Sequence, residues 1–341
     1  MSTKSMQKTV EYERIMVQDN FEYFKSNNTK KQRTFAKDIK LSLDRESKFI
    51  DPKYFYDDYG SQLFDRICTL SEYYPYTCEL SILKNIAKNP VPHLTNDVRL
   101  VELGSGSSSK TRLLIDALFR SQKQVEYFPI DISDVLIDSA KELCDGYNNL
   151  KVTGIIDTYE NGLDFIKHYD EKSNLITFLG SSFGNFNKVN GSIFLKRIHD
   201  LMKSSDYFLI GLDLKKDSNV LFNAYNDKKG LTAQFNLNVL ERINRELDGN
   251  FEISQFVHKA YFNESKGRIE MYLCSQSNQT VVIPKASLSL KLFKNELIHT
   301  ENSYKFTISQ IDTMFEKADL DIIQLWFDAK KYFVLILAKR F

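Results

Sequence analysis

A glycine-rich turn near residue 105 has the residue types and spacing of a ligand-binding loop. Gly104, Ser105 and Gly106 form the turn. The apolar residues 98–103 before it predict a buried strand, and residues 108–121 after it have the apolar spacing of a helix. Glycine permits a sharp turn and a close approach of the backbone to a ligand. A helix start favours an anionic or nucleotide-like group, so we expect such a group here; the alternative is a plain strand–turn–helix.

The turn does not match the two commonest nucleotide motifs. Ser109 stands where the dinucleotide motif G-x-G-x-x-G needs its third glycine, and the P-loop pattern is absent. With the acidic residue Glu102 at the end of the strand, the turn is instead similar to the first motif of class I S-adenosylmethionine methyltransferases.

Polar residues follow the next strands of the pattern at the points where each strand ends. Asp131 is placed to accept hydrogen bonds from ribose hydroxyls, or else to cap the following helix. Asp157 is a candidate partner for an adenine amino group. Gly180, Ser182 and Asn185 offer room and hydrogen bonds beside a reacting centre, or form a simple glycine-rich loop.

Two other segments carry polar chemistry. Tyrosines are dense in residues 54–76, where they either line a polar organic pocket or form a hinge between domains. In residues 268–274 the alternation places Arg268, Glu270 and Tyr272 on one strand face. Such a face is more often exposed to solvent than functional.

Strands and helices alternate between residues 98 and 213. Strands are expected at residues 98–103, 126–131, 150–154, 175–179 and 207–212, with helices at 108–121, 133–144, 159–168 and 189–202. This pattern predicts an α/β fold with a parallel sheet, helices on both faces and a ligand over the carboxyl ends of the strands. The remaining elements are expected as helices at 218–226, 231–247 and 306–318, β segments within 252–292, and a hairpin at 321–338. The first 30 residues or so predict a helix or a frayed arm.

Composition narrows the function classes. The 341 residues carry a net charge of +1 and are 42% apolar, which favours a sizeable core and gives no general attraction to nucleic acid or anionic lipid. No stretch is long and apolar enough for a membrane helix. The cysteines and histidines lack metal-site spacing, so we expect no metal, no disulfide framework and a reducing, cytoplasmic location.

Six motifs in one order resemble the histidine-specific Nα-methyltransferases of ergothioneine biosynthesis. They lie at residues 54–64, 72–75, 101–106, 179–185, 235–247 and 268–271. The resemblance implies a class I Rossmann-like methyltransferase with a seven-stranded, mostly parallel sheet and a second α+β substrate-binding domain. Residues 76–214 and 280–341 would form the S-adenosylmethionine-binding domain, and residues 1–75 and 215–279 the substrate-binding domain. No second catalytic module follows, which suggests a stand-alone methyltransferase.

The resemblance also assigns roles to individual residues. The positions implied to bind S-adenosylmethionine are Tyr56, Gly104, Ser105, Gly106, Lys110, Asp131 and Asp157. The positions implied to contact the substrate are Asn185 and Tyr225 at its carboxylate, Tyr56, Phe64, Gly180 and Ser182 near its amine, and Tyr73 and Glu270 at an imidazole. Tyr272, on the strand face of Glu270, is larger than the residue expected beside an imidazole.

The implied reaction is methylation of the α-amino group of L-histidine, in three steps, with S-adenosylmethionine as cofactor. An alternative is the same chemistry on another aromatic or modified amino acid. We expect a small-molecule substrate, a monomer, and no nucleic acid, membrane or metal. Two other classes are a catalytically idle nucleotide-binding module and a nucleic-acid methyltransferase, but the latter would favour a basic surface, which the net charge of +1 does not indicate.

Overall fold

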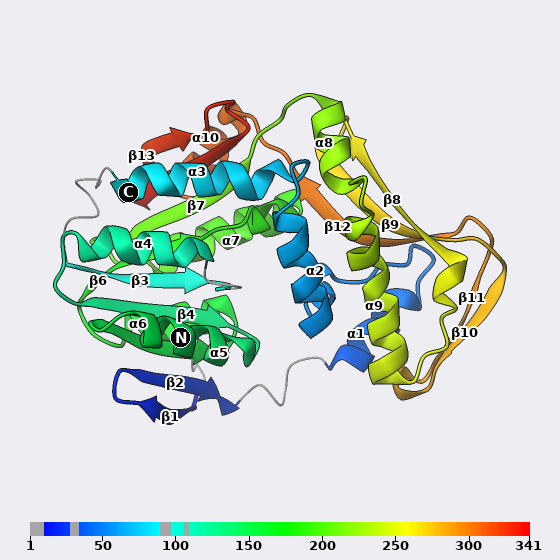
Figure 1. Cartoon of the computed structure of the whole chain (residues 1–341), viewed down its shortest axis with the longest axis horizontal. Helices are drawn as coiled ribbons and strands as arrows, with labels where there is room; N and C mark the ends of the chain where they lie inside the picture. Colours follow the sequence, from blue (N-terminus) through cyan, green and yellow to red (C-terminus); the bar gives the residue numbers. More distant parts are fainter. Residues whose placement is uncertain (1–9, 28–33, 89–96, 106–108) are drawn as a thin grey trace, which may run out of the picture.

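A nine-stranded sheet forms one half of the molecule (Figure 1). The computed structural model describes residues 10–27, 34–88, 97–105 and 109–341. The strand order is β1-β2-β5-β4-β3-β6-β7-β14-β13. The central parallel strands are β3 (Val98–Leu103), β4 (Val125–Asp131), β5 (Leu150–Ile156), β6 (Ser173–Phe178) and β7 (Tyr207–Asp213). The hairpin of β13 (Leu320–Phe327) and β14 (Phe333–Arg340) joins β7 in antiparallel fashion.

Helices cover both faces of this sheet. One face packs against α3 (Tyr74–Lys88), α4 (Ser109–Phe119) and α5 (Val135–Gly146). The other packs against α6 (Tyr159–Lys167), α7 (Lys188–Leu201) and α10 (Ile308–Lys317). Because both faces are covered, the central strands read as nearly continuous apolar runs, as the sequence predicted. None of the helices in the described parts of the chain combines the length and apolar character that crossing a bilayer requires.

The expected seven strands are present, and an N-terminal hairpin adds two more. β1 (Tyr12–Gln18) and β2 (Phe21–Ser26) pair with each other, and β2 continues the sheet in parallel with β5. The expectation of a helix or a frayed arm was therefore wrong for these residues. Their β-branched and aromatic side chains on either side of the Asp19–Asn20 turn favour a hairpin instead.

A second, α+β unit lies beside the carboxyl ends of the central strands (Figure 1). Its helical segments are α1 (Phe35–Leu43), η2 (Pro52–Phe55), α2 (Asp58–Cys68), α8 (Ser218–Tyr225), α9 (Leu231–Leu247), η5 (Ile253–Gln255) and η6 (Pro284–Ala286). Its strands are β8 (Phe256–Asn263), β9 (Arg268–Ser275) and β12 (Leu297–Tyr304), in the order β12-β9-β8, and the pair β10 (Gln279–Ile283) and β11 (Leu288–Leu292). These elements share one apolar core.

Strand pairing differs from the expected division of the chain at two places. Residues 12–26 belong to the large sheet, although the expected boundary grouped them with the substrate-binding part. Residues 279–304 pack with the second unit, because β12 pairs with β9 and the side chains of β10 and β11 enter its core. We therefore propose that the second unit comprises residues 34–73 and 215–304.

Candidate active site

The glycine turn after β3 has the conformation that its sequence predicts. Gly104 has a φ of +75°, and a Cβ atom there would lie 2.8 Å from the Tyr159 hydroxyl. Its N–H donates to the carbonyl of Ile130 on β4 at 2.9 Å. Ser105 follows and is buried, whereas Gly106 lies outside the described residues. A side chain at residue 104 would both strain the backbone and fill the space in front of Tyr159.

A buried carboxylate secures the base of this turn. Glu102 accepts hydrogen bonds from the hydroxyls of Thr111 on α4 at 2.7 Å and Tyr127 on β4 at 2.6 Å. Burial raises the pKa of Glu102 to about 7, and the two hydroxyl donors only partly oppose that rise. Glu102 thus ties β3, β4 and the start of α4 together beneath the loop.

The two candidate cofactor carboxylates lie at the ends of neighbouring strands. Asp131 ends β4, is half-buried, and accepts a backbone hydrogen bond from Ser133 at 3.0 Å. It is not the N-cap of α5, a position that Asp134 takes. Asp157 follows β5, is 2% exposed, and accepts from the Tyr12 hydroxyl of the N-terminal hairpin at 3.0 Å. Both therefore lie on the edge of the sheet that carries the glycine turn.

Glu79 of α3 joins the loop after β6 to α4. Its carboxylate accepts from the Gly180 N–H at 3.0 Å and from Lys110 Nζ at 2.8 Å. Although burial lowers the pKa of Lys110, the Glu79 carboxylate outweighs it and raises that pKa. Gly180 has a φ of +81°, and a Cβ atom there would approach Lys110 Nζ to 3.2 Å. Lys110 thus fixes this loop through Glu79.

The predicted aromatic residues form one continuous wall. Tyr56 contacts Phe64 with ring centroids 5.6 Å apart, Phe64 contacts Tyr73 at 6.0 Å, and Tyr73 contacts Tyr225 at 6.3 Å. Phe235 of α9, which was not among the predicted site residues, packs against both Tyr56 and Phe64. The wall therefore joins four segments of the second unit: the end of η2, α2, α8 and α9, together with the residue before α3.

Two polar residues of β12, Glu301 and Ser303, lie on the same face of their sheet as this wall. Glu301 pairs with Met271 and Ser303 with Ile269, and both of these β9 residues enter the core of the second unit. Directly paired residues of antiparallel strands point to the same face. Ser303 also bonds to the Tyr225 hydroxyl at 2.8 Å, which fixes the position of β12 against α8.

Glu301 is a half-buried carboxylate with no hydrogen-bond partner for its side chain among the described residues. Burial raises the pKa of Glu301 to about 7, while the nearby Lys305 ammonium opposes the rise. Burial is also the main cause that raises the pKa of Tyr56, Tyr73 and Tyr225, and the Glu301 carboxylate contributes in each case. Glu301 therefore lies among the tyrosines as an acceptor that a ligand can use.

Glu270 and Tyr272, expected at an imidazole, lie on the other face of β9, so this expectation is corrected. Glu270 accepts from Arg268 Nε at 2.7 Å and from the hydroxyls of Tyr261 at 2.8 Å and Tyr272 at 2.9 Å. Burial would raise the pKa of Glu270, but these donors lower it to about 2. Glu270 pairs across the ladder with Asn302, between Glu301 and Ser303. Its side chain thus points away from the aromatic wall and is fully partnered.

The loop after β6 brings its small residues next to β12. η4 (Ser182–Asn185) packs against this strand, and a Cβ atom on Gly184 would lie 3.5 Å from Ser303 Oγ. Ser182 donates to the Leu179 carbonyl at 3.2 Å, and Ser181 has a φ of +61°. Asn185 ends η4 half-buried, so the structure places its amide on the segment that links the large sheet to Ser303.

A buried charge network lies behind the wall. Lys305 Nζ is 2.7 Å from Asp213, 3.0 Å from the Tyr225 hydroxyl and 2.8 Å from Ser303 Oγ. Asp213, at the end of β7, also accepts from the Tyr74 hydroxyl at 2.7 Å and pairs with Lys216. Burial opposes ionisation of Asp213, but the two lysines hold its pKa below the usual range. The site therefore has a cation, Lys305, directly behind two of its hydroxyls.

Comparison with known proteins identifies the family. A family model described as "Histidine-specific methyltransferase, SAM-dependent" matches residues 35–340. The chain belongs to this family of S-adenosylmethionine-dependent methyltransferases. It is 35% identical to the histidine N-alpha-methyltransferase of Mycolicibacterium smegmatis over 89% of this chain and 94% of that one. Ergothioneine biosynthesis protein 1 of Neurospora crassa is 30% identical over 83% of this chain but 32% of its own length. The L-tryptophan methyltransferase trpM of Psilocybe serbica is 26% identical over 85% of this chain and 88% of its own.

The observed edge of the sheet fits the cofactor of this methyltransferase. Gly104 leaves open the space that a Cβ atom would fill, and Asp131 presents a half-buried carboxylate that accepts from the backbone N–H groups beside it. A ribose offers hydroxyl donors to such a carboxylate at the end of the second strand. The residues at this edge therefore fit S-adenosylmethionine, and we propose that the glycine turn and Asp131 bind it.

Besides Phe235, four polar residues of the candidate site were not predicted from the sequence: Glu301, Ser303, Lys305 and Glu79. In residues 297–304 apolar and polar residues do not alternate regularly, and the structure has a bulge there, between His299 and Glu301. Glu79 lies in α3, for which no helix was predicted. A glycine inside a strand pattern often marks the close approach of another group. Gly211 of β7 is such a glycine, because a Cβ atom there would lie 2.2 Å from the Glu79 carboxylate.

Proposed function

We propose that this methyltransferase acts on the α-amino group of L-histidine, in three successive transfers, to give N,N,N-trimethylhistidine for ergothioneine biosynthesis. The family description and the names of the relatives from Mycolicibacterium and Neurospora support the substrate class. The observation that carries the proposal is the Glu301 carboxylate, which has no hydrogen-bond partner among the described residues and lies among the site tyrosines.

An imidazole suits the pair Glu301 and Ser303 better than other side chains do. Glu301 can accept the ring N–H, and the Ser303 hydroxyl can donate to the second ring nitrogen. An indole offers the N–H but no second nitrogen, and an aliphatic side chain would leave Glu301 desolvated and unpaired. A site built with such polar groups rejects analogues that cannot pair with them. We therefore assign imidazole recognition to β12 in place of Glu270 and Tyr272.

The remaining site residues align the amine. We propose that Asn185 holds the substrate carboxylate beside Tyr225, while Tyr56, Phe64 and Gly180 surround the amine and Tyr73 lies beside the ring. When bound, S-adenosylmethionine supplies an electrophilic methyl group on a positively charged sulfur. The protein's main task is then to hold a neutral amine in line with that methyl group. In a peptide the α-amino group has a pKa of about 8, and the positively charged sulfur beside the bound substrate favours the neutral amine, so a strong general base is not required.

Space for repeated transfer comes from the loop after β6. Gly180 has no side chain, and the flanking Ser181 and Ser182 are small. A larger side chain at residue 180 would also displace Lys110, whose Nζ lies 3.2 Å from the position of a Cβ atom. We propose that this room admits the mono- and dimethylated amines as substrates in their turn.

Mass spectrometry tests the proposal directly. The purified protein is incubated with S-adenosylmethionine and each of the twenty amino acids, and histidine is followed over time. We expect histidine alone to gain methyl groups, with mono- and dimethyl species that appear and then decline as the trimethyl species accumulates. Accumulation that stops at the monomethyl species would contradict the three steps, and methylation of tryptophan in place of histidine would contradict the substrate.

A further inference from the structure

Lys305 is a fully buried ammonium group whose donors are all used. Its side chain is 0% exposed. An ammonium has three N–H donors, and Lys305 has three acceptors within hydrogen-bond distance: Asp213, the Tyr225 hydroxyl and Ser303 Oγ. Each site hydroxyl therefore accepts a hydrogen bond from Lys305. The ammonium nitrogen has no lone pair, so neither hydroxyl can donate to it, and both hydroxyl protons must point away from Lys305.

The two hydroxyls bring two protons, and only one of them can lie between Tyr225 and Ser303, which are 2.8 Å apart. Since the Lys305 ammonium cannot accept a hydrogen bond, the second hydroxyl proton is available to a ligand. Ser303 accepts from both Lys305 and Tyr225 in this arrangement, so its oxygen is filled and its own proton is free to be donated. The Ser303 hydroxyl therefore offers a hydrogen-bond donor to a ligand that binds at Glu301, and it disfavours a ligand that brings a second N–H group.

We propose that Lys305 is a positioning residue that fixes Ser303, both directly and through Tyr225, as a hydrogen-bond donor to the ligand, so that the site binds the neutral imidazole of histidine and discriminates against the imidazolium. This inference rests on the proposed function. A neutral imidazole has one N–H for Glu301 and one bare nitrogen for Ser303. An imidazolium has two N–H groups, and it would add a positive charge next to a hydroxyl that is 2.8 Å from the Lys305 ammonium.

Lys216 offers a matched control, because it pairs with the same aspartate from the other side. Its ammonium contacts Asp213, the Tyr74 hydroxyl at 2.9 Å and the Leu214 carbonyl at 2.6 Å. No contact of Lys216 with Tyr225 or Ser303 is present in the described structure. Removal of either lysine takes one cation from Asp213, but only the removal of Lys305 frees the two site hydroxyls.

The test is calorimetric titration of histidine into the enzyme saturated with S-adenosylhomocysteine, at pH values from 5.5 to 7.5. The wild type is compared with Lys305→Met, Ser303→Ala and Lys216→Met. A side-chain imidazole has a pKa of about 6.5, so a site that requires the neutral ring loses about tenfold in affinity across this range from ring protonation alone. Protonation of the α-amine contributes similarly in all four proteins. Lys305 also opposes the rise in the pKa of Glu301, so Ser303→Ala, which keeps that lysine, is the variant that isolates the ring.

We expect the affinity of Lys305→Met and Ser303→Ala to fall about tenfold less than that of the wild type between pH 7.5 and 5.5, whereas Lys216→Met follows the wild type. Ser303→Ala keeps the Lys305–Asp213 ion pair, so its pH profile still tests the inference if Lys305→Met does not fold. Parallel profiles for the wild type and the Ser303 variant, or an equal flattening in Lys216→Met, would overturn the inference. Failure of the wild type to bind histidine at any pH would instead overturn the proposed function.

Discussion

Glu301 differs from the other carboxylates of the site in having no hydrogen-bond partner for its side chain within the described residues. Asp131 and Asp157 accept backbone N–H groups next to their strands, and Glu79 holds a loop. A half-buried carboxylate that has lost part of its hydration without gaining a protein partner costs free energy in the empty protein. That cost is recovered when a ligand donates to it, which is the physical reason to place the imidazole at Glu301.

We expect the loss of activity at low pH to follow the protonation of Glu301. Burial raises the pKa of Glu301 to about 7, so its carboxylate is available as an acceptor above that pH and is lost below it. We expect the ratio of kcat/KM for histidine, wild type over Glu301→Gln, to fall about tenfold per pH unit below pH 7. Steady-state rates from pH 5.5 to 8.5 provide the measurement. A ratio that stays constant with pH would show that Glu301 does not titrate in the free enzyme.

Only some residues of this site could be predicted from the sequence. Gly104, Asp131 and the tyrosines stand in local patterns that determine their conformation or position, and the structure places them at one edge of the sheet. The choice of Glu270 failed because alternation shows which residues share a face but not which face meets the pocket. Its neighbour Arg268, two residues away on the same face, was the signal that Glu270 would be paired within its own strand.

At the scale of elements, α3 couples the chemistry of the loop after β6 to the rest of the fold. Glu79 is 0% exposed and bridges Lys110 of α4 and the Gly180 backbone. Loop positions of this kind depend on side-chain contacts between distant segments, so local sequence patterns did not show them. The parallel strands, by contrast, were predicted closely because their apolar runs are bounded by glycine and acidic residues.

We expect Glu79→Gln to lower kcat with histidine about tenfold or more, because the Gly180 loop loses its charged acceptor and Lys110 loses its counter-ion. The double variant Glu79→Gln/Lys110→Met should recover stability relative to Glu79→Gln, since no buried cation is left unpaired. Rates and urea unfolding of the two single variants and the double variant give the coupling energy. Strictly additive effects would argue against the bridge.

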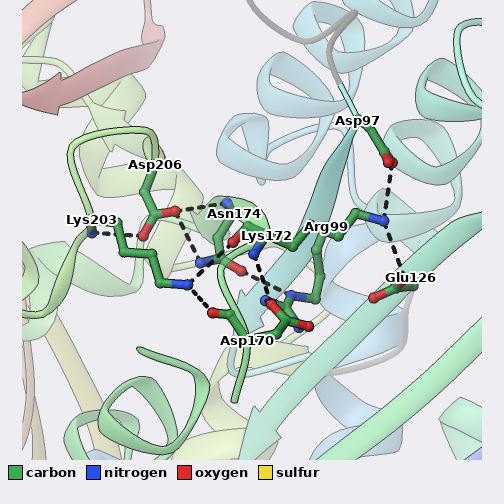
Figure 2. Close-up of polar contacts among 8 residues, drawn as sticks. All are labelled: Asp97, Arg99, Glu126, Asp170, Lys172, Asn174, Lys203 and Asp206. Atoms are coloured by element: carbon green, nitrogen blue, oxygen red, sulfur yellow. Dashed lines mark hydrogen bonds and ion pairs between the residues drawn. The ribbon is translucent and has the colours of Figure 1, made fainter. Parts of the chain in front are cut away.

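At the scale of the whole molecule, the two edges of the large sheet have different roles. Figure 2 shows the network at the amino ends of the strands, where Arg99 bonds to Asp170 at 2.7 Å and to Asn174 at 2.9 Å, and Asp206 holds Asn174. Arg99 is 0% exposed and also stacks over Phe128. All the candidate site residues of the sheet lie at the opposite, carboxyl ends, so this network contributes to stability and not to catalysis.

We expect Asp170→Asn to reduce the free energy of unfolding by about 1–3 kcal/mol, since Arg99 stays buried and loses its charged partner. Its kcat/KM should remain within about twofold of the wild type. Asp97→Asn is the matched control, because Asp97 is 77% exposed where it pairs with Lys172. That change should cost no more than about 0.5 kcal/mol. A large loss of activity in Asp170→Asn without unfolding would contradict the separation of the two edges.

The most direct test of the account compares Glu301→Gln with Glu270→Gln, two isosteric changes on opposite faces of one small sheet. A hydrogen bond to a charged group is worth about 1.5–3 kcal/mol, so we expect Glu301→Gln to lower kcat/KM for histidine by about 10- to 100-fold. Glu270→Gln should change it by less than about threefold, once both variants are shown to be folded. The reverse order, with Glu270→Gln the more damaging to turnover, would contradict the assignment of histidine recognition to β12.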